Sequence, residues 1–470
     1  MKKWKFYFGI LFVWLPSVVL GQTEYWALTL TDSLSCVVEK TYLNKTTEGL
    51  YGCSTTVHYI DGFGRALQDV TVFGTPDNAY DFISSYSYDY RGRLCREYVP
   101  FSDVDYTVRG AYRSSRSPDC FGTDKNYAYT AYSYEAAPWG RVAKVTKAGA
   151  QSHQSGSGVV TTYGLNGEGE VRLFRAMRDG TLVSDGYYGA GKLQKTTVVD
   201  EVGDTVVSYT DNRGVEVMSA AVSADGRLET YSVHDDYGRL RWVISPEGVK
   251  RLGDGVDAAV LSSYAYRYDY DVLGRLVEKR LPGDGAVYYV YDGRDRLVLS
   301  QDGEQRKSGR WDYILYDRQN RPVEEGEVVL SGKSREELQS EAWDSVGYVP
   351  SGTREAYRYT LYDSYEGNGT VAPHAFDDSS GYSNAYHALA TGRLTAVKER
   401  VLDSDDWVTT TYYYDAEGQL LQEVSENSLG GISRRDLSYD MPGRLLWSRE
   451  CHTDGLGEEH VLEWSTGYDM

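Results

Sequence analysis

Cysteine, proline and phenylalanine are scarce in this chain of 470 residues, which contains 5, 11 and 10 of them. The cysteines are Cys36, Cys53, Cys95, Cys120 and Cys451. They form no C-x-x-C pair, so the sequence encodes no zinc ribbon, and their odd number leaves at least one without an internal partner. Two interpretations stay open for the others: disulfide bridges between Cys36 and Cys53 and between Cys95 and Cys120, or free thiols.

Long hydrophobic runs are absent beyond residue 20, so we expect no membrane-spanning helix in the rest of the chain. One apolar run, from Phe6 to Leu20, follows three lysines and ends at small residues. This pattern is typical of a secretory signal peptide over residues 1–21, with an N-terminal anchor helix as the alternative. We therefore expect export through a signal peptide, to the cell surface, the periplasm or the medium.

Positive charge is in deficit, because 49 Lys and Arg stand against 69 Asp and Glu, for a net charge of −20. A nucleic acid would be repelled at long range, which excludes it as a partner. Motifs for acyl transfer are missing as well, since there is no G-x-S-x-G sequence and no cysteine in a nucleophile setting. We predict no catalytic residue and no enzymatic activity.

Motifs for cofactors and metals are incomplete. Gly186–Leu193 has the glycine spacing of a phosphate loop but lacks the Ser or Thr that must close it. Asp269–Arg280 begins like a calcium loop but carries Leu and Arg at ligand positions. His452 and His460 do not have the H-E-x-x-H spacing of a zinc site. We predict no cofactor-binding residue and no metal ligand.

Tyrosine, in contrast, is abundant, with 43 residues. Tyr264, Tyr266, Tyr268 and Tyr270 place four rings two residues apart, and several shorter runs repeat this spacing. A period of two puts such rings on one face of a β-strand. The sequence therefore predicts strands that end in tyrosine.

The same phrase, Y-D-x-x-G-R-L, follows many of these runs. Some copies depart from it: Asp295 and Asn320 replace the glycine, and Gln419 replaces the arginine. The predicted copies are Asp61–Leu67, Tyr88–Leu94, Tyr187–Leu193, His234–Leu240, Tyr270–Leu276, Tyr291–Leu297, Tyr316–Pro322, Tyr414–Leu420 and Tyr439–Leu445.

The phrase predicts a β-hairpin corner. The Asp carboxylate can accept backbone N–H bonds two residues on, and glycine takes the positive φ that closes the turn. The Asp and the Arg four residues later can pair, which for an exposed pair contributes only about 0–1 kcal/mol. The residues assigned to these structural turns are Tyr88, Asp89, Gly92, Arg93, Tyr270, Asp271, Gly274, Arg275, Tyr291, Asp292, Tyr316, Asp317, Tyr414, Asp415, Gly418, Tyr439, Asp440, Gly443 and Arg444.

The spacing of the copies suits a repeating sheet. Tyr270 and Tyr291 lie 21 residues apart, and Tyr291 and Tyr316 lie 25 apart, which is close to two strands plus two turns. One hairpin cannot bury its own face, but many stacked hairpins can. We predict an all-β fold of repetitive antiparallel hairpins that form a sheet or partial shell.

Few helices interrupt the pattern. Ser334–Trp343 has the Ser and Glu of a capping box, so we expect a short helix there and a second one near residues 256–263. Pro246–Gly248 is interpreted as a turn, and residues 364–391 as a surface loop.

The repeated phrase resembles that of RHS/YD-repeat proteins, the family that includes bacterial polymorphic toxins and, more distantly, teneurins. The resemblance runs from Tyr88 to Asp469, and the region that includes Tyr163–Phe174 resembles the uncharacterised N-terminal domain of Bacteroidota-type RHS proteins. It implies an N-terminal β-rich domain over residues 22–165 and a repeat region over residues 166–470. The family's Asp-Pro-x-Gly-Leu core segment is missing, so we expect an N-terminal fragment, truncated within its repeats.

In this family such repeats wind into a hollow β-shell. The resemblance therefore implies an exported structural scaffold, part of a shell that encloses or presents a C-terminal effector absent from this chain. Its partner would be the C-terminal remainder of the parent protein or an effector module. The alternative is a cell-surface carbohydrate-binding or adhesion module, because exposed Tyr and Trp beside carboxylates suit glycans.

Overall fold

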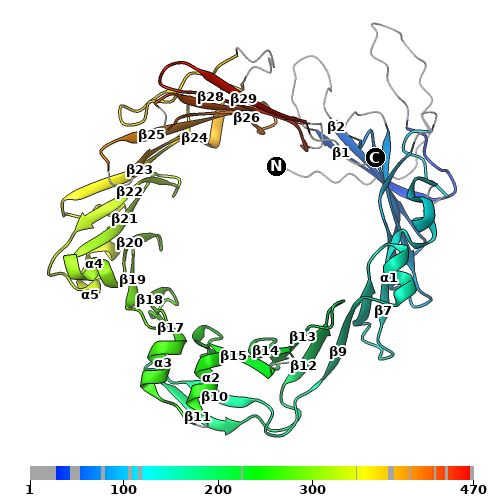
Figure 1. Cartoon of the computed structure of the whole chain (residues 1–470), viewed down its shortest axis with the longest axis horizontal. Helices are drawn as coiled ribbons and strands as arrows, with labels where there is room; N and C mark the ends of the chain where they lie inside the picture. The colour runs from blue at the N-terminus through cyan, green and yellow to red at the C-terminus, as the bar shows by residue number, and fades with distance from the viewer. Residues whose placement is uncertain are drawn as a thin grey trace. The chain divides into compact units, whose positions relative to one another are not determined.

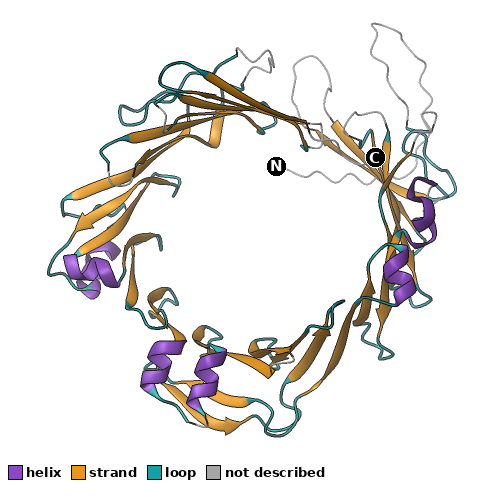
Figure 2. Cartoon of the chain, viewed as in Figure 1, coloured by secondary structure: helices purple, strands orange, loops and turns teal. Residues whose placement is uncertain are grey.

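The computed structural model describes residues 28–42, 53–75, 80–103, 108–114, 119–223, 226–253, 255–345, 347–378, 386–401, 404–427, 430–439 and 443–465. The predicted signal peptide and the predicted turn residue Asp440 lie outside these ranges. Within them the chain consists of antiparallel strands with five short α-helices, which confirms the all-β prediction (Figure 2). Of the helices in these ranges, none combines the length and apolarity needed to cross a membrane.

The chain forms two compact units. Figure 1 colours the chain by residue number, from blue at the N-terminus to red at the C-terminus. Unit 1 comprises residues 1–158, 374–390 and 410–470, and unit 2 comprises residues 159–373 and 391–409. We describe each unit by itself.

Unit 1 contains two antiparallel ladders. The first is β1–β2–β3–β4–β5–β7–β8, with the short β6 on β4, and the second is β25–β26–β27–β28–β29, in which β25 belongs to unit 1 from residue 410 on. The bounds are β1 Ser35–Tyr42, β2 Cys53–Ile60, β3 Ala66–Val72, β4 Asp81–Tyr88, β5 Leu94–Tyr98, β6 Phe101–Asp103, β7 Tyr129–Tyr134, β8 Val142–Thr146, β25 Trp407–Tyr414, β26 Leu420–Glu426, β27 Ile432–Tyr439, β28 Leu445–Thr453 and β29 Glu459–Ser465, with a 3-10 helix Asp119–Tyr127 and α1 Ala150–Ser155.

In unit 2, β9 pairs with β12. From β12 to β23 each strand then pairs with the next one, which forms one long antiparallel ladder. The bounds are β9 Val159–Leu165, β10 Arg172–Ala176, β11 Leu182–Tyr187, β12 Gln194–Val199, β13 Thr205–Thr210, β14 Glu216–Ser223, β15 Gly226–His234, β16 Leu240–Ile244, α2 Pro246–Leu252, α3 Ala258–Tyr264, β17 Ala265–Tyr270, β18 Leu276–Arg280, β19 Ala286–Tyr291, β20 Leu297–Gln301, α4 Gly303–Ser308, β21 Arg310–Tyr316, β22 Pro322–Val329, α5 Arg335–Trp343, β23 Arg354–Asp363 and β24 Ala390–Arg400.

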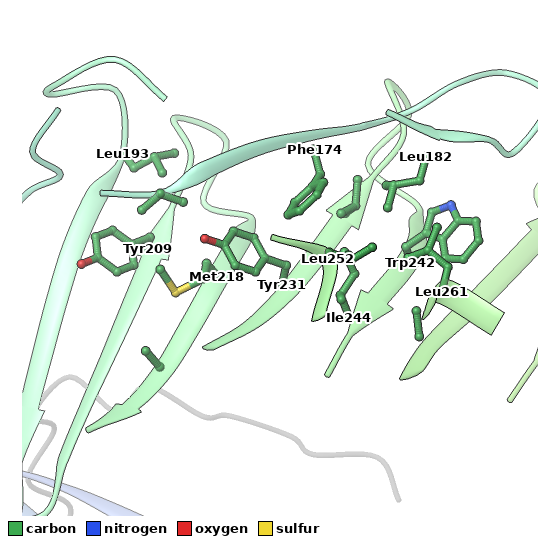
Figure 3. Packing of buried hydrophobic residues seen from close by; sticks show 14 of the residues in the cluster. Phe174, Leu182, Leu193, Tyr209, Met218, Tyr231, Trp242, Ile244, Leu252 and Leu261 are labelled. Atoms are coloured by element: carbon green, nitrogen blue, oxygen red, sulfur yellow. The ribbon is translucent and has the colours of Figure 1, made fainter. Parts of the chain in front are cut away.

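Segments outside the main ladder, which we call excursions, cover one face of the unit 2 sheet. The β10–β11 hairpin pairs only with itself and places Phe174 and Leu182 over β13–β17, where they meet Tyr231 and Trp242 (Figure 3). The helices α2 and α3 add apolar side chains to the same cluster. Further along, α5 packs Leu338 against β19–β22. A single-layered sheet cannot bury its own face, so each excursion supplies a local core.

The helices agree only in part with the sequence-based predictions. The helix predicted at Ser334–Trp343 is present as α5, with both hydrogen bonds of the capping box, and the one predicted near residues 256–263 is α3. The prediction of a turn at Pro246–Gly248 is wrong, because α2 begins there. Ser245 accepts a hydrogen bond from Gly248 N–H, and proline suits the first helical position.

The disulfide interpretation is wrong, and the free-thiol alternative holds for three of the five cysteines. Cys36, Cys95 and Cys451 carry free thiols. Register explains why Cys36 does not reach Cys53: in the β1–β2 pair, Cys36 lies opposite Tyr59, and Cys53 lies opposite Tyr42, at the other end of the ladder. A disulfide needs Cα atoms within about 7 Å.

The predicted surface loop after β23 contains no helix or strand over residues 364–378 and 386–389, which confirms the prediction there, but part of it is held against a ladder. Residues 374–378, which we call the strap, pack against the second ladder of unit 1. His374 N–H donates to Thr411 Oγ1, and Asp377 N–H donates to Gln422 Oε1, both at 2.9 Å. Strand side chains thus satisfy the polar backbone of the strap, an arrangement that no local sequence pattern displays.

Candidate functional site

The repeated corner is the candidate site, and its aspartate is the centre of a hydrogen-bond network. At Asp271, Oδ1 accepts the N–H groups of Leu273 at 3.0 Å and Arg275 at 2.9 Å, and Oδ2 accepts Arg275 Nε at 2.7 Å. Gly274 takes a φ of 86° to close the turn. The same network occurs at Asp61, Asp89, Asp235, Asp292 and Asp317.

A second interaction joins five of the corners to a later turn. The guanidinium of a corner lies 4.2–5.1 Å from the ring centroid of a tyrosine that precedes a later turn. The hydroxyl of that tyrosine donates to the carbonyl of the residue after the arginine, at 2.6–2.9 Å. We call this paired contact the corner latch. The latches are Arg65–Tyr88, Arg93–Tyr134, Arg239–Tyr270, Arg275–Tyr291 and Arg296–Tyr316.

The altered copies extend the latch. Asp295 and Asn320 stand at the glycine position with φ of 60° and 66°. Asp295 Oδ1 accepts Arg275 Nη1 at 2.9 Å, and Asn320 Oδ1 accepts Arg296 Nη1 at 3.1 Å. These two replacements therefore offset backbone strain with a hydrogen bond to the previous corner, a role that motif inspection alone missed.

The copy at Asp415 uses the turn with Gln419 in place of the arginine. Asp415 Oδ1 accepts the N–H of Gln419 at 2.8 Å, and Gly418 N–H donates to the Asp415 carbonyl at 3.2 Å. Gly443 has a φ of 92°. Arg444 donates to the Gly74 carbonyl at 2.8 Å, within unit 1.

The interpretation of Tyr187–Leu193 as a repeat copy is wrong. The strands on its two sides do not pair with each other, because β11 pairs with β10 and β12 pairs with β9 and β13. Gly191 N–H donates instead to the Asn166 carbonyl at 2.9 Å. The physical reason is that Tyr188 stands where the corner needs an aspartate to accept backbone N–H groups.

Carboxylates in the corners and in two other ion pairs, at Glu170 and Asp363, have lowered pKa values. Burial alone would raise the pKa of Asp271, but hydrogen bonds from Arg275 outweigh it, and the pKa is lowered. Burial likewise opposes the fall at Glu170, where bonds from Lys195 and Tyr209 bring the pKa to about 2. Hydrogen bonds from Arg321 bring the pKa of Asp363 to about 2.

Acid is therefore expected to destabilise the fold. A group whose pKa is lowered by folding stabilises the folded state above its unfolded pKa, here 4.5 for Glu170 and 3.8 for aspartate, and loses that contribution as the pH falls towards 2. We expect the urea midpoint to fall steadily between about pH 5 and about pH 2.5, as measured by intrinsic fluorescence. A midpoint that is constant over this range would contradict the network.

The described ranges contain no cluster of three or more His, Cys, Asp and Glu side chains arranged to hold a metal ion. The corners bring together oppositely charged pairs whose donors and acceptors are already satisfied. Such an arrangement holds strands together.

Comparison with known proteins finds a family model for part of the chain and a counterpart for the fold. The model of a domain of unknown function, DUF6443, matches residues 37–165. No curated protein matches the chain. A chain of the TcdB2-TccC3-Cdc42 crystal structure is similar with 17% identity and a TM-score of 0.50, covering 92% of this chain and 20% of that one. The structure of a Photorhabdus luminescens Tc holotoxin pore matches with 17% identity and a TM-score of 0.49, with the same coverage.

The first of these likenesses shows a shared fold, which agrees with the RHS-type resemblance of the repeats. The chain spans about a fifth of the length of the solved chains that it matches. What those whole toxin complexes do is therefore a property of the neighbours, and it enters below only as a proposal.

Proposed function

We propose that this protein is an exported structural β-scaffold, a section of the wall of an RHS-type shell that encloses or presents a C-terminal effector. The partner is the C-terminal remainder of the parent protein or an effector module. The role requires no catalytic residue, cofactor or metal, and it places the protein in the secreted, periplasmic or cell-surface compartment.

The corner latch is the observation that carries this proposal. Each latch joins two corners by a cation–π contact and a hydrogen bond, so the strands between them cannot separate without breaking both. Repeated along unit 2, latches of this kind resist the bending and slippage of a single-layered sheet. The fold shared with a chain of the TcdB2-TccC3-Cdc42 structure gives independent support for a wall.

The test is electron microscopy of the full-length parent protein. We expect a hollow particle, and we expect its C-terminal module to resist protease until the particle is denatured. An extended rod, or a C-terminal module digested at the rate of the isolated module, would contradict the proposal. Sequencing of the downstream reading frame provides the control, because the proposal requires further repeats after Met470.

A further inference from the structure

Three turns of unit 1 lie along one edge of its first ladder. They join β2 to β3 (residues 61–65), β4 to β5 (residues 89–93) and β7 to β8 (residues 135–141). Because β3 pairs antiparallel with β4, and β5 with β7, all three turns fall at the same edge of the sheet. Neighbouring turns are two strands apart, about 10 Å, so the row is about 20 Å long.

Each of these turns carries one aromatic side chain at its tip. Phe63, Tyr90 and Trp139 are 87%, 88% and 69% exposed. They take no part in the corner latches, which use Tyr88 and Tyr134. The geometry of the turn does not require them either, because its closure depends on the carboxylate and the glycine. We call Phe63, Tyr90 and Trp139 the aromatic edge.

The three turns pack against one another. The side chain of Arg65 lies on Gly92 of the second turn, where an added Cβ atom would be 2.6 Å from Nη1. The side chain of Arg93 lies on Gly140 of the third turn, where an added Cβ atom would be 3.4 Å from Cδ. With the two latches, these contacts fix the spacing of the aromatic edge.

The charge of this edge differs from that of the whole chain. The chain has a net charge of −20, but the three turns contain four arginines and three carboxylates. Each carboxylate pairs with an arginine of its own turn at 2.5–2.7 Å, in the pairs Asp61–Arg65, Asp89–Arg93 and Glu135–Arg141. The guanidinium groups that lie 5.2–5.8 Å from the tip rings are those of Arg65, Arg91 and Arg141. These turns therefore combine apolar rings with guanidinium groups and carry no uncompensated negative charge.

Size decides between a protein partner and a membrane. The edge of a single sheet is about 10 Å thick, so the row offers about 200 Å². A stable protein–protein interface needs about 800 Å² on each partner. Single rings that protrude from turns suit a bilayer interface instead, where an aromatic ring lies among the lipids and its polar atoms stay in water. An arginine beside each ring can bind a lipid phosphate.

We propose that the aromatic edge docks on the surface of a phospholipid bilayer, with its three rings inserted at the boundary between headgroups and acyl chains. The bilayer is zwitterionic, because a chain with a net charge of −20 is repelled by an anionic one at long range. This contact goes beyond the scaffold role and does not depend on it, since the latches that join the strands use other side chains.

The test is co-sedimentation of the exported form, from Gln22 on, with phosphatidylcholine vesicles. The apolar run Phe6–Leu20 is left out because it would bind lipid by itself. We expect the protein to sediment with the vesicles, and to do so equally well in about 0.5 M NaCl, because ring insertion rather than charge drives the contact. Failure to sediment, or release by salt, would overturn the proposal.

Serine variants separate ring insertion from a general affinity for lipid. We expect Phe63→Ser, Tyr90→Ser and Trp139→Ser each to weaken vesicle binding about tenfold, with an unchanged melting temperature because the rings are exposed. Trp464→Ser is the matched control, because Trp464 is also exposed but lies on a strand, β29. It should leave vesicle binding unchanged. Equal binding by Trp139→Ser and Trp464→Ser would overturn the assignment.

Sedimentation velocity without vesicles tests the other possible occupant, a second copy of the chain. We expect the same oligomeric state for the unmodified protein and for the variant that combines Phe63→Ser, Tyr90→Ser and Trp139→Ser. Self-association that this triple variant abolishes would assign the aromatic edge to a contact between copies, and would overturn the membrane proposal.

Discussion

Replacing Asp292 with alanine is expected to lower the free energy of unfolding by about 3–5 kcal/mol, the usual effect of removing one partner of a buried ion pair. The Asp292 side chain is 0% exposed and that of Arg296 is 9% exposed, with 2.5 Å between Oδ2 and Nη2. The variant leaves the guanidinium buried without its carboxylate and frees two backbone N–H groups. Urea denaturation, combined with hydrogen exchange of β19 and β20, measures the loss.

Asp200→Ala is the matched control. Asp200 forms a turn of the same kind, with its Oδ1 accepting three backbone N–H groups at 2.8–2.9 Å, but Asp204 stands where the arginine would be. Its turn is exposed, so we expect a loss of about 1 kcal/mol. Equal losses at the two sites would show that the buried pair contributes nothing beyond turn formation, which would contradict the role of Arg296 at its corner.

Replacing Arg434 with alanine is expected to cost about 3 kcal/mol and to release the strap. The Arg434 side chain is 8% exposed and joins Asp377 of the strap to Asp436 of β27, with Nε 3.0 Å from Asp436 Oδ2. Removal of the guanidinium leaves the buried Asp436 with Gln422, at 2.7 Å, as its one remaining side-chain donor among the described residues. Hydrogen exchange of residues 374–378 and limited proteolysis near them should both increase.

Arg435→Ala controls for the loss of a positive charge from the same strand. Arg435 is 44% exposed and lies 3.5 Å from Glu450, so we expect an effect below about 1 kcal/mol and an unchanged strap. A strap that stays protected in Arg434→Ala would mean that this ion pair does not hold it.

The corners follow from the sequence because their chemistry is local. Asp271 and Gly274 lie three residues apart, and each satisfies the requirements of the turn whatever surrounds it. The Asp–Arg pair is predictable as well, but only as an exposed pair of little energy. The Asp292–Arg296 pair is buried, next to a strand end whose Tyr291 backbone exchanges hydrogen bonds with Gln339 of α5, and such burial is not encoded in the motif itself.

The corner latch could not be predicted from the motif, because it depends on which corners become neighbours. Arg275 reaches Tyr291, only 16 positions on, whereas Arg93 reaches Tyr134, 41 positions on. The number of residues between a latch arginine and its tyrosine is therefore not constant, so sequence spacing does not identify the tyrosine. The signal that sequence reasoning could have used is that an arginine and a later tyrosine recur in the same phrase, which suggests that they meet in space.

The excursions were missed for a related reason. The β10–β11 hairpin and the strap interrupt the repeat, and interruptions look like loops when they are read alone. Phe174 and Leu182 are apolar in a polar stretch, but only the sheet face beneath them shows what they cover (Figure 3). Tertiary packing decides the role of such segments.

A double-mutant cycle on Arg296 and Tyr316 tests the central claim, that latches join successive corners into one wall, most directly. Arg296→Lys keeps a cation for Asp292 but removes the planar group that lies 4.7 Å from the Tyr316 ring, and Tyr316→Leu removes the ring. Our account predicts that the two losses are coupled by about 1 kcal/mol. Losses that add with no coupling would show that the corners fold as independent turns, and would contradict it.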